Sequence, residues 1–418
     1  MRAPGWVLKL VESLSANLWL FPVVGMLGAV ALSLLLHEID GRLAQDASAW
    51  YLFRGGPDGA RAVLGAIATS IMTFTGVVFS VTVLVLQLAS NQFSPRVLRT
   101  FLADRAMQTS LAVFIGTFVY SLLTLRTVRG SSNVVGEFVP SLSVWFAVVL
   151  ATGSVAMFVF FIHHVSQSIR AVNVLRRIGD ETREAIAKLF PEGLGESASC
   201  PDQGPGGEPT LVVLHRGPSG VVMALAEELV WDVASSSEVT VALVPMLGEF
   251  VPEGSVLFEV WGDPARLDVE GLASSVAIGR ERSVYQDPAF GFRGIVDIAE
   301  RALSPGINDP STAVQALDEL HDLLRRLATR RFPDPIRVDE EGRPRIVVRR
   351  PDFDAYVQLA LEEIRCYGAG SVQVVRRMRS LIDDLLPLAP PSRRGELRRQ
   401  QRALDATGNA ETPPATSV

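Results

Sequence analysis

The uncharged stretch from Ala62 to Ser90 carries small or polar residues at steps of three, four or seven. With Asn91, which follows directly, they are Thr69, Thr73, Gly76, Ser80 and Gln87. At the spacing of an α-helix these residues fall on one face. Hydrocarbon cannot hydrogen-bond hydroxyls and amides, so a membrane helix usually turns such a face toward protein or water. The six residues are therefore candidates to line a pore. Alternatively, they bond to neighbouring helices, as Ser and Thr commonly do in membranes.

A second group of polar residues lies in the C-terminal half of the chain. Its members are Asp287, Arg293, Asp297, Glu300, Arg301, Asn308 and Asp309. If these side chains converge, their mixed charge would suit a polar small molecule or a divalent ion. The alternative is structural, because Asp297 and Arg301 have the i, i+4 spacing of a helical ion pair and Asp309 is placed to cap a helix beginning at Pro310.

Four apolar segments are long enough to cross a bilayer: 17–36, 62–90, 106–125 and 139–165. Each reaches the roughly 20 residues that a hydrocarbon core requires. As a helix the second would be about 43 Å long, so it must tilt or project beyond the bilayer, as an inner helix of a bundle does. Basic residues are denser before the first segment, after the second and after the fourth. By the positive-inside rule this places both termini in the cytoplasm of a multi-pass protein of the bacterial inner membrane.

No Asp, Glu, Lys or Arg lies within these four segments. Proton relays and ion-coupled pumps usually need ionisable groups in the membrane, so an active transporter is disfavoured while a passive, neutral-lined pore is not. Four helices enclose little space, and a conducting path would require a homo-oligomer with the second helix innermost. Pairs of small residues four apart also permit close helix approach, within one subunit or between subunits. They are Gly25 with Ala29, Ala112 with Gly116, and Ala147 with Ala151.

Two further groups of residues lie at the ends of the apolar segments, near the membrane boundary. Arg96, Arg99 and Arg105 follow the second segment and predict a short basic helix that contacts anionic membrane lipids, worth about 1 kcal/mol per basic residue. His163 and His164 end the fourth segment. They could sense protons, or they could simply extend to the headgroups.

Charged residues are concentrated after residue 166, which indicates a water-soluble half. We predict a connecting helix and a Pro/Gly-rich linker over 166–209, an α+β region over 210–388 and a disordered tail over 389–418. Strand patterns occupy 210–216, 239–244, 255–260 and 345–349. Helical patterns occupy 224–234, 290–303, 310–329, 352–367 and 371–386.

Several function classes find no support in the sequence. It has no nucleophile elbow, Walker loop, dinucleotide fingerprint or zinc-binding His pair, so we expect no enzyme, no metal site and no cofactor. The two cysteines, Cys200 and Cys366, are far apart and suggest neither a disulfide framework nor a metal site. A net charge of -6 gives no sign of a nucleic-acid partner.

Several phrases resemble those of one family, the bacterial predicted membrane proteins of domain-of-unknown-function family 2254. They are Phe79-Ser80, 92–96 (QFSPR), 116–120 (GTFVY), 248–251 (GEFV), 286–291 (QDPAFG) and, most specifically, 301–310 (RALSPGINDP). The resemblance covers roughly residues 10–385. It implies an integral membrane protein with a cytosolic C-terminal region, and it brings no activity.

The sequence thus predicts an α-helical polytopic membrane domain of four helices followed by an α+β cytosolic domain. We expect a homo-oligomeric channel or passive permease with a cytosolic regulatory domain, surrounded by membrane lipids. The alternative is a non-conducting membrane-anchored sensor or interaction scaffold. A polar small molecule or ion is the ligand expected of the cytosolic domain if its polar cluster is a site.

Overall fold

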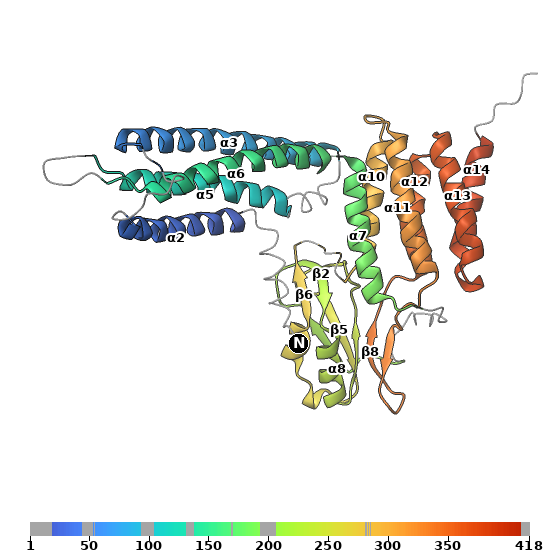
Figure 1. The fold of residues 1–418 in the computed structure, drawn as a ribbon. Helices are drawn as coiled ribbons and strands as arrows, with labels where there is room; N and C mark the ends of the chain where they lie inside the picture. The colour runs from blue at the N-terminus through green and yellow to red at the C-terminus, as the bar shows by residue number, and fades with distance from the viewer. Residues whose placement is uncertain are drawn as a thin grey trace, which may run out of the picture. The chain divides into compact units, whose positions relative to one another are not determined.

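The structure, a computed structural model, describes residues 19–43, 53, 55–92, 104–130, 138–168, 170–192, 206–280, 282, 284 and 286–410. The chain divides into two compact units that join between Arg170 and Ala171. The first contains four long apolar helices, and the second contains both helices and strands (Figure 1). The predicted fold class, a helical membrane domain followed by an α+β region, is confirmed.

The membrane unit consists of α2 (Leu20–Leu43), α3 (Pro57–Gln92), α5 (Arg105–Thr127) and α6 (Ser141–Ser168). All four are long and apolar enough to span a bilayer. At 36 residues, α3 is about 54 Å long, well beyond a hydrocarbon core of about 30 Å. Helix α2 continues beyond residue 36, so the helix includes the acids Glu38 and Asp40 that the predicted segment leaves out.

Two kinds of packing hold the membrane helices together. Helices α2 and α5 approach closely through small residues, since a β-carbon on Gly25 would lie 2.6 Å from the carbonyl oxygen of Ala112. Helix α3 instead packs through aromatic rings: Phe74 stacks on Phe158 of α6, with centroids 4.7 Å apart, and meets Phe114 of α5 edge-on. The pairs Gly25 with Ala29 and Ala112 with Gly116 therefore join α2 to α5 within one subunit.

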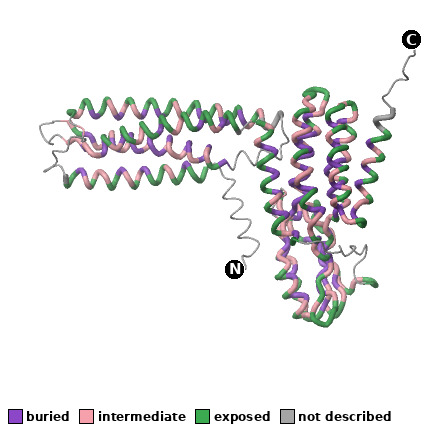
Figure 2. The backbone as a smooth tube through the Cα atoms, turned by 45° about the vertical axis from the view of Figure 1, so that its right-hand side comes forward, coloured by how far each residue is buried: buried purple, intermediate pink, exposed green. Residues whose placement is uncertain are grey.

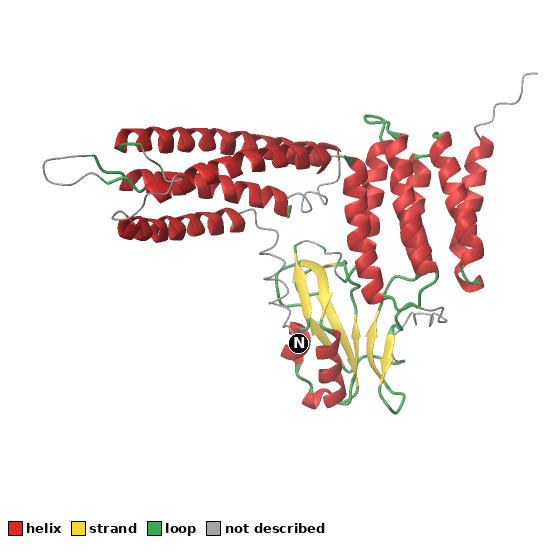
Figure 3. Cartoon of the chain, in the orientation of Figure 1, coloured by secondary structure: helices red, strands yellow, loops and turns green. Residues whose placement is uncertain are grey.

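Helices of the second unit run side by side in a bundle (Figure 3). They are α7 (Ala171–Leu189), α10 (Pro288–Leu303), α11 (Pro310–Ala328), α12 (Phe353–Tyr367), α13 (Val372–Leu388) and α14 (Gly395–Ala410). Their core is built from fully buried residues such as Phe292, Leu320, Leu361 and Leu381. Burying each such side chain contributes about 1.5–3 kcal/mol relative to leaving it in water. The helical patterns predicted at 290–303, 310–329, 352–367 and 371–386 are confirmed.

Helix α14 corrects the prediction of a disordered tail over 389–418. Residues 395–410 form a helix whose Leu397 and Leu404 are buried, and Arg379 of α13 donates to Asp405 at 2.8 Å. The two leucines are seven positions apart and so lie on one helical face, which docks on the bundle. Residues 411–418 lie outside the described part of the chain.

The predicted connecting helix is divided in two. Helix α6 ends at Ser168 and α7 begins at Ala171. On α7, the guanidinium of Arg183 is largely covered and binds Asp322 and Glu319 of α11. Residues 193–205 of the predicted linker lie outside the described residues.

Strands of the second unit form two sheets. A five-stranded sheet has the order β1-β5-β3-β8-β7, and a three-stranded sheet has the order β4-β2-β6. All pairs are antiparallel except β3 with β8. The strands are β1 (Leu211–Leu214), β2 (Gly220–Leu225), β3 (Thr240–Leu243), β4 (Phe250–Val251), β5 (Val256–Trp261), β6 (Val276–Gly279), β7 (Ile336–Val338) and β8 (Pro344–Val348).

Short helices accompany these sheets. Helix α8 (Glu227–Ser236) and helix α9 (Val269–Ser274) pack on the β-rich part, contributing Val230 and Leu272 to its core. The helix predicted at 224–234 begins later than expected because β2 continues to Leu225. Helices α10 and α11 lie in the sequence between β6 and β7, so the helical bundle interrupts the chain of strands.

Candidate functional site

The polar stripe of α3 lies on the face of the helix that the membrane unit does not cover (Figure 2). Thr69, Thr73, Gly76, Ser80 and Gln87 are all exposed, and nothing lies within 4 Å of a β-carbon on Gly76. The buried face is on the opposite side of the helix and is mostly apolar. It consists of Ala60, Leu64, Ala68, Ile71, Val78, Thr82 and Val85.

Hydroxyls of the stripe bond to their own helix. Thr73 donates to the carbonyl of Thr69 at 3.0 Å, and Ser80 donates to that of Gly76 at 2.9 Å. Gln87 has no hydrogen-bond partner within the residues that the structure describes. The interpretation that these three side chains join α3 to other helices of the same subunit is therefore wrong. The side chain of Asn91 lies outside the described residues.

Buried hydrogen bonds of the membrane unit do join α5 to α6. The hydroxyls of Thr117 and Ser154 lie 3.0 Å apart, and Tyr120 donates its hydroxyl to the carbonyl of Ser143 at 3.0 Å. Both contacts are buried. The polar side chains that hold the subunit together are thus distinct from the α3 stripe.

Two buried carboxylates at the ends of the membrane unit were not singled out from the sequence. Asp40 of α2 accepts from the amides of Leu142 and Ser143 at 2.9 and 3.0 Å, and so caps the start of α6. Asp104 caps α5 and lies 2.8 Å from Nε2 of His164. The interpretation of His164 as a side chain that only extends to the headgroups is therefore incomplete. The contacts of these two acids with α6 had no sequence signal, because their partners on α6 lie 60 or more positions away.

The predicted basic helix at the lipid surface is only partly described. Arg105 is exposed at the start of α5, directly after the Asp104 cap. Arg96 and Arg99 lie outside the described residues.

The polar cluster predicted around 287–309 does not converge. Helix α10 has 16 residues and is about 24 Å long, with Asp287 before its start and Asp309 after its end. Asp287 is buried and accepts from Nε and Nη2 of Arg282 at 3.0 and 2.6 Å. Burial raises the pKa of this carboxyl, and Arg282 opposes that rise. The cluster therefore consists of separate local arrangements along one helix.

At the far end of α10 the predicted cap is confirmed. Asp309 accepts from the backbone amide of Thr312 at 3.2 Å and from its hydroxyl at 2.6 Å, and Pro310 is the first residue of α11. Asn308 is exposed with a φ of 49°, a left-handed conformation that Asn tolerates better than most residues. At this end of the cluster, Asn308 forms a turn and Asp309 caps α11.

In the middle of α10, one arginine is surrounded by three acids. Arg293 donates to Asp297 at 2.8 Å and to Glu363 of α12 at 2.7 Å, and lies 3.7 Å from Glu300. The predicted partner of Asp297 was Arg301, which is exposed and in no ion pair within the described residues. Two arginines, Arg293 and Arg301, lie four positions from Asp297 in the sequence. In the structure Asp297 binds Arg293.

The two glutamates of this group, Glu300 and Glu363, have pKa values shifted in opposite directions. Burial and the neighbouring Glu363 raise the pKa of Glu300 to about 7, while the bond to Arg293 lowers the pKa of Glu363. Two carboxyls close together favour a state in which one of them keeps its proton. Within the described residues, no group of three or more His, Cys, Asp or Glu side chains is placed to hold a metal ion.

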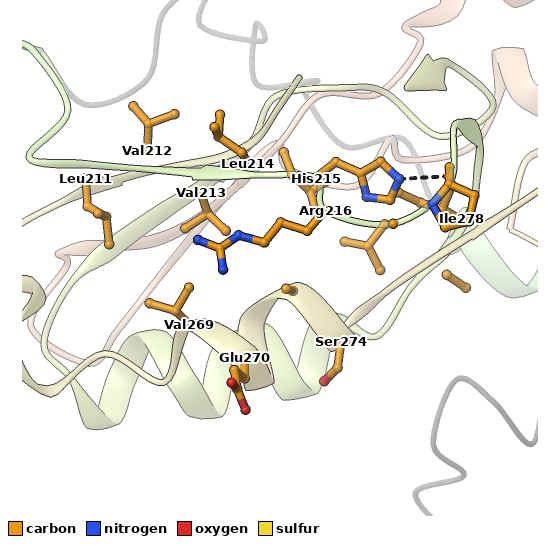
Figure 4. Close-up of a pocket in the computed structure, with 16 residues that line it drawn as sticks. Leu211, Val212, Val213, Leu214, His215, Arg216, Val269, Glu270, Ser274 and Ile278 are labelled. Carbon is orange, nitrogen blue, oxygen red and sulfur yellow. Dashed lines mark hydrogen bonds between the residues drawn. The ribbon is translucent and has the colours of Figure 1, made fainter. Parts of the chain in front are cut away.

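A groove of about 800 Å³ lies in the β-rich part, between β1 and α9 (Figure 4). Its walls are mainly aliphatic, with Val213 and Leu257 on one side and Val269 on the other. The guanidinium of Arg216 points into the space between β1 and α9, and Nε2 of His215 bonds to the carbonyl of Pro218 at 3.0 Å. None of the predicted cluster residues lines this groove.

Comparison with known proteins gives the family. The family described as predicted membrane protein (DUF2254) matches residues 15–384. The uncharacterized proteins Rv1290c of Mycobacterium tuberculosis and Mb1321c of Mycobacterium bovis are each 33% identical over 403 residues, which is 94% of this chain and 76% of theirs. No solved structure matches the chain. The fold, the four candidate spans and these matches show that the chain belongs to the DUF2254 family of predicted membrane proteins.

Proposed function

We propose that this protein is a homo-oligomeric channel or passive permease of the bacterial inner membrane, with both termini in the cytoplasm. Several copies of α3 would turn their polar stripes toward a shared path. The observation that carries the proposal is the position of the stripe, which lies opposite the face that packs on the rest of the subunit. A second copy of the chain is the natural cover for such a face, because lipid cannot hydrogen-bond the Gln87 amide.

The chemistry of the stripe favours passive movement of solute. Thr69, Thr73, Ser80 and Gln87 offer hydroxyls, carbonyls and an amide, and none of them is ionisable. The charged groups on α2, Glu38, Asp40 and Arg42, lie near its C-terminal end, and Asp40 is occupied as the cap of α6. A neutral path suits a polar or ionic solute that moves down its gradient, without proton coupling.

The second unit is proposed as a cytosolic regulator without enzymatic activity. Helix α7 follows α6 after two residues, and Arg183 fixes it to Glu319 and Asp322 of α11. The helix that follows the last membrane helix is thereby tied to the bundle through partly buried ion pairs. A conformational change in the bundle would be transmitted to α6 through α7.

A non-conducting scaffold or sensor is the competing function, and one observation favours it. Thr73 and Ser80 already satisfy their hydroxyls on their own helix, which lowers the cost of facing lipid. In that case the stripe would border hydrocarbon, and the protein would act through its second unit alone.

Cysteine crosslinking of the full-length protein in membranes separates the two functions. In a background with Cys200→Ser and Cys366→Ser, Thr73→Cys and Ser80→Cys should form disulfides between subunits. Thr82→Cys is the matched control, since Thr82 is buried on the opposite face. Solute flux into proteoliposomes should then fall in Ser80→Phe. A protein that is oligomeric but never crosslinks at 73 or 80, or that supports no flux of any small solute, would contradict a channel.

A further inference from the structure

Four exposed apolar side chains gather at one end of the helical bundle. They are Val172 in the first turn of α7, Ile307 in the turn between α10 and α11, Tyr367 at the end of α12 and Val372 at the start of α13, with exposures of 38%, 43%, 60% and 73%. They come from four places in the sequence, so no single amphipathic helix accounts for them.

Contacts within the bundle place these residues at the same end. Helices α7 and α11 run in the same direction, because Arg183 binds Asp322 and, toward their ends, Arg330 donates to the carbonyl of Phe190 at 2.6 Å. The start of α7 is therefore level with the start of α11. A β-carbon on Gly368, directly after α12, would lie 3.3 Å from Leu303 at the end of α10. The α10–α11 and α12–α13 turns lie together in Figure 3.

Chain connectivity limits how far the start of α7 can lie from the end of α6. Helix α6 has 28 residues and is about 42 Å long, enough to cross the hydrocarbon core and reach the headgroups. From Ser168, the last residue of α6, to Ala171, the first of α7, the chain can extend at most about 11 Å. The start of α7 is thus tethered within about 11 Å of the end of α6.

The chemistry of this end matches a membrane surface. Tyrosine is enriched at headgroup level, and basic residues beside apolar ones are typical of interfacial segments. Arg176 of α7 and Arg301 of α10 are exposed toward the same end of the bundle. Asp309, two positions after Ile307 in the sequence, is engaged as the cap of α11.

We propose that the bundle end formed by Val172, Ile307, Tyr367 and Val372 rests in the headgroup region of the bilayer, with lipid as its occupant. The apolar side chains insert among the headgroups, and the neighbouring arginines favour anionic lipid. This contact holds the bundle against the membrane by a second attachment besides α7. The proposed contact with lipid does not depend on whether the protein conducts a solute.

The test uses full-length protein in lipid nanodiscs, without its native cysteines (Cys200→Ser, Cys366→Ser). A nitrobenzoxadiazole fluorophore is attached to Val372→Cys or, as a matched control, to Val338→Cys. Val338 is also an exposed valine, with 50% exposure, and it lies on β7, which follows the far end of α11. We expect lipids with doxyl groups near the headgroup to quench the label at 372 several-fold more than at 338. The quenching should be stronger in nanodiscs containing phosphatidylglycerol than in phosphatidylcholine alone.

Two results would overturn the proposal. Equal and weak quenching at 372 and 338 in both lipids would show that this end faces water. Crosslinking between subunits at 372 without lipid quenching would show that a second copy of the chain covers the patch.

Discussion

Gly291 on α10 lies directly against Thr182 on α7, and a β-carbon at position 291 would overlap the Thr182 hydroxyl oxygen. Thr182 is fully buried, and its hydroxyl donates to the carbonyl of Ile178 at 2.7 Å. The same two helices also meet at Gly294, where a β-carbon would have ordinary contacts of 3.7 Å with Ile178. The closest approach of α7 to α10 therefore depends on one glycine.

Gly291→Ala should destabilise the protein, because Thr182 must move or lose its hydrogen bond to make room. Overpacking of this kind costs about 1–3 kcal/mol. Gly294→Ala is the control and should be neutral or stabilising by about 0.5–1 kcal/mol, since alanine is the better helix former. Thermal unfolding of both variants in detergent measures the difference. Equal melting temperatures for the two variants would contradict the close packing at 291.

Gly25 has the corresponding role in the membrane unit. A β-carbon there would lie 2.6 Å from the backbone carbonyl oxygen of Ala112, whereas one on Gly28 would have nothing within 4 Å. Gly25→Ala should therefore separate α2 from α5 and lower the melting temperature of the full-length protein. Gly28→Ala should leave it nearly unchanged or raise it. If both glycines tolerate alanine equally, α2 and α5 do not pack through this site.

Glu300 predicts a pH dependence of stability. Its pKa is raised to about 7 from an ordinary value of 4.5, so the folded chain keeps a proton that the unfolded chain releases. The free energy of unfolding should therefore fall as the pH rises from 4.5 to about 7. Above about pH 7 the stability that the bound proton contributes is fully lost. Glu300→Gln, which cannot ionise, should lack this loss and gain stability relative to the parent protein between pH 5 and 8.

Denaturant unfolding at several pH values tests this behaviour. Exposed Glu340→Gln serves as the control and should follow the parent protein across the range. Glu363 contributes in the opposite sense, because its lowered pKa adds stability that is lost on acidification. Parallel curves for Glu300→Gln and the parent would show that Glu300 titrates normally.

Long periodic segments were predictable from the sequence because their signal is local. The four membrane helices follow from apolar length, and α11 follows from its Asp309 cap and Pro310. Helix α14 was missed because its composition is polar and rich in arginine. The signal that could have found it is the seven-residue spacing of Leu397 and Leu404, both buried.

Partners distant in sequence were not predictable. Arg293 lies beside Glu363 and Asp40 lies beside Ser143, and no local pattern marks either pair. Short strands such as β7, with three residues at a sheet edge, carry too few residues to show an alternating pattern. The predicted convergence of 287–309 failed for a simpler reason. Residues that are neighbours in sequence are spread along a helix about 24 Å long.

The single parallel pair of strands has a consequence for synthesis of the chain. Val241 of β3 pairs with Ile346 of β8, with the α10–α11 hairpin between them in the sequence. Until β8 leaves the ribosome, the edge of β3 that pairs with β8 has backbone amide and carbonyl groups without a partner. Unpaired edges of this kind template aggregation. Chains that terminate between β3 and β8 should therefore be prone to aggregate. The sheet can be completed only after residues 344–348, which form β8, have been translated.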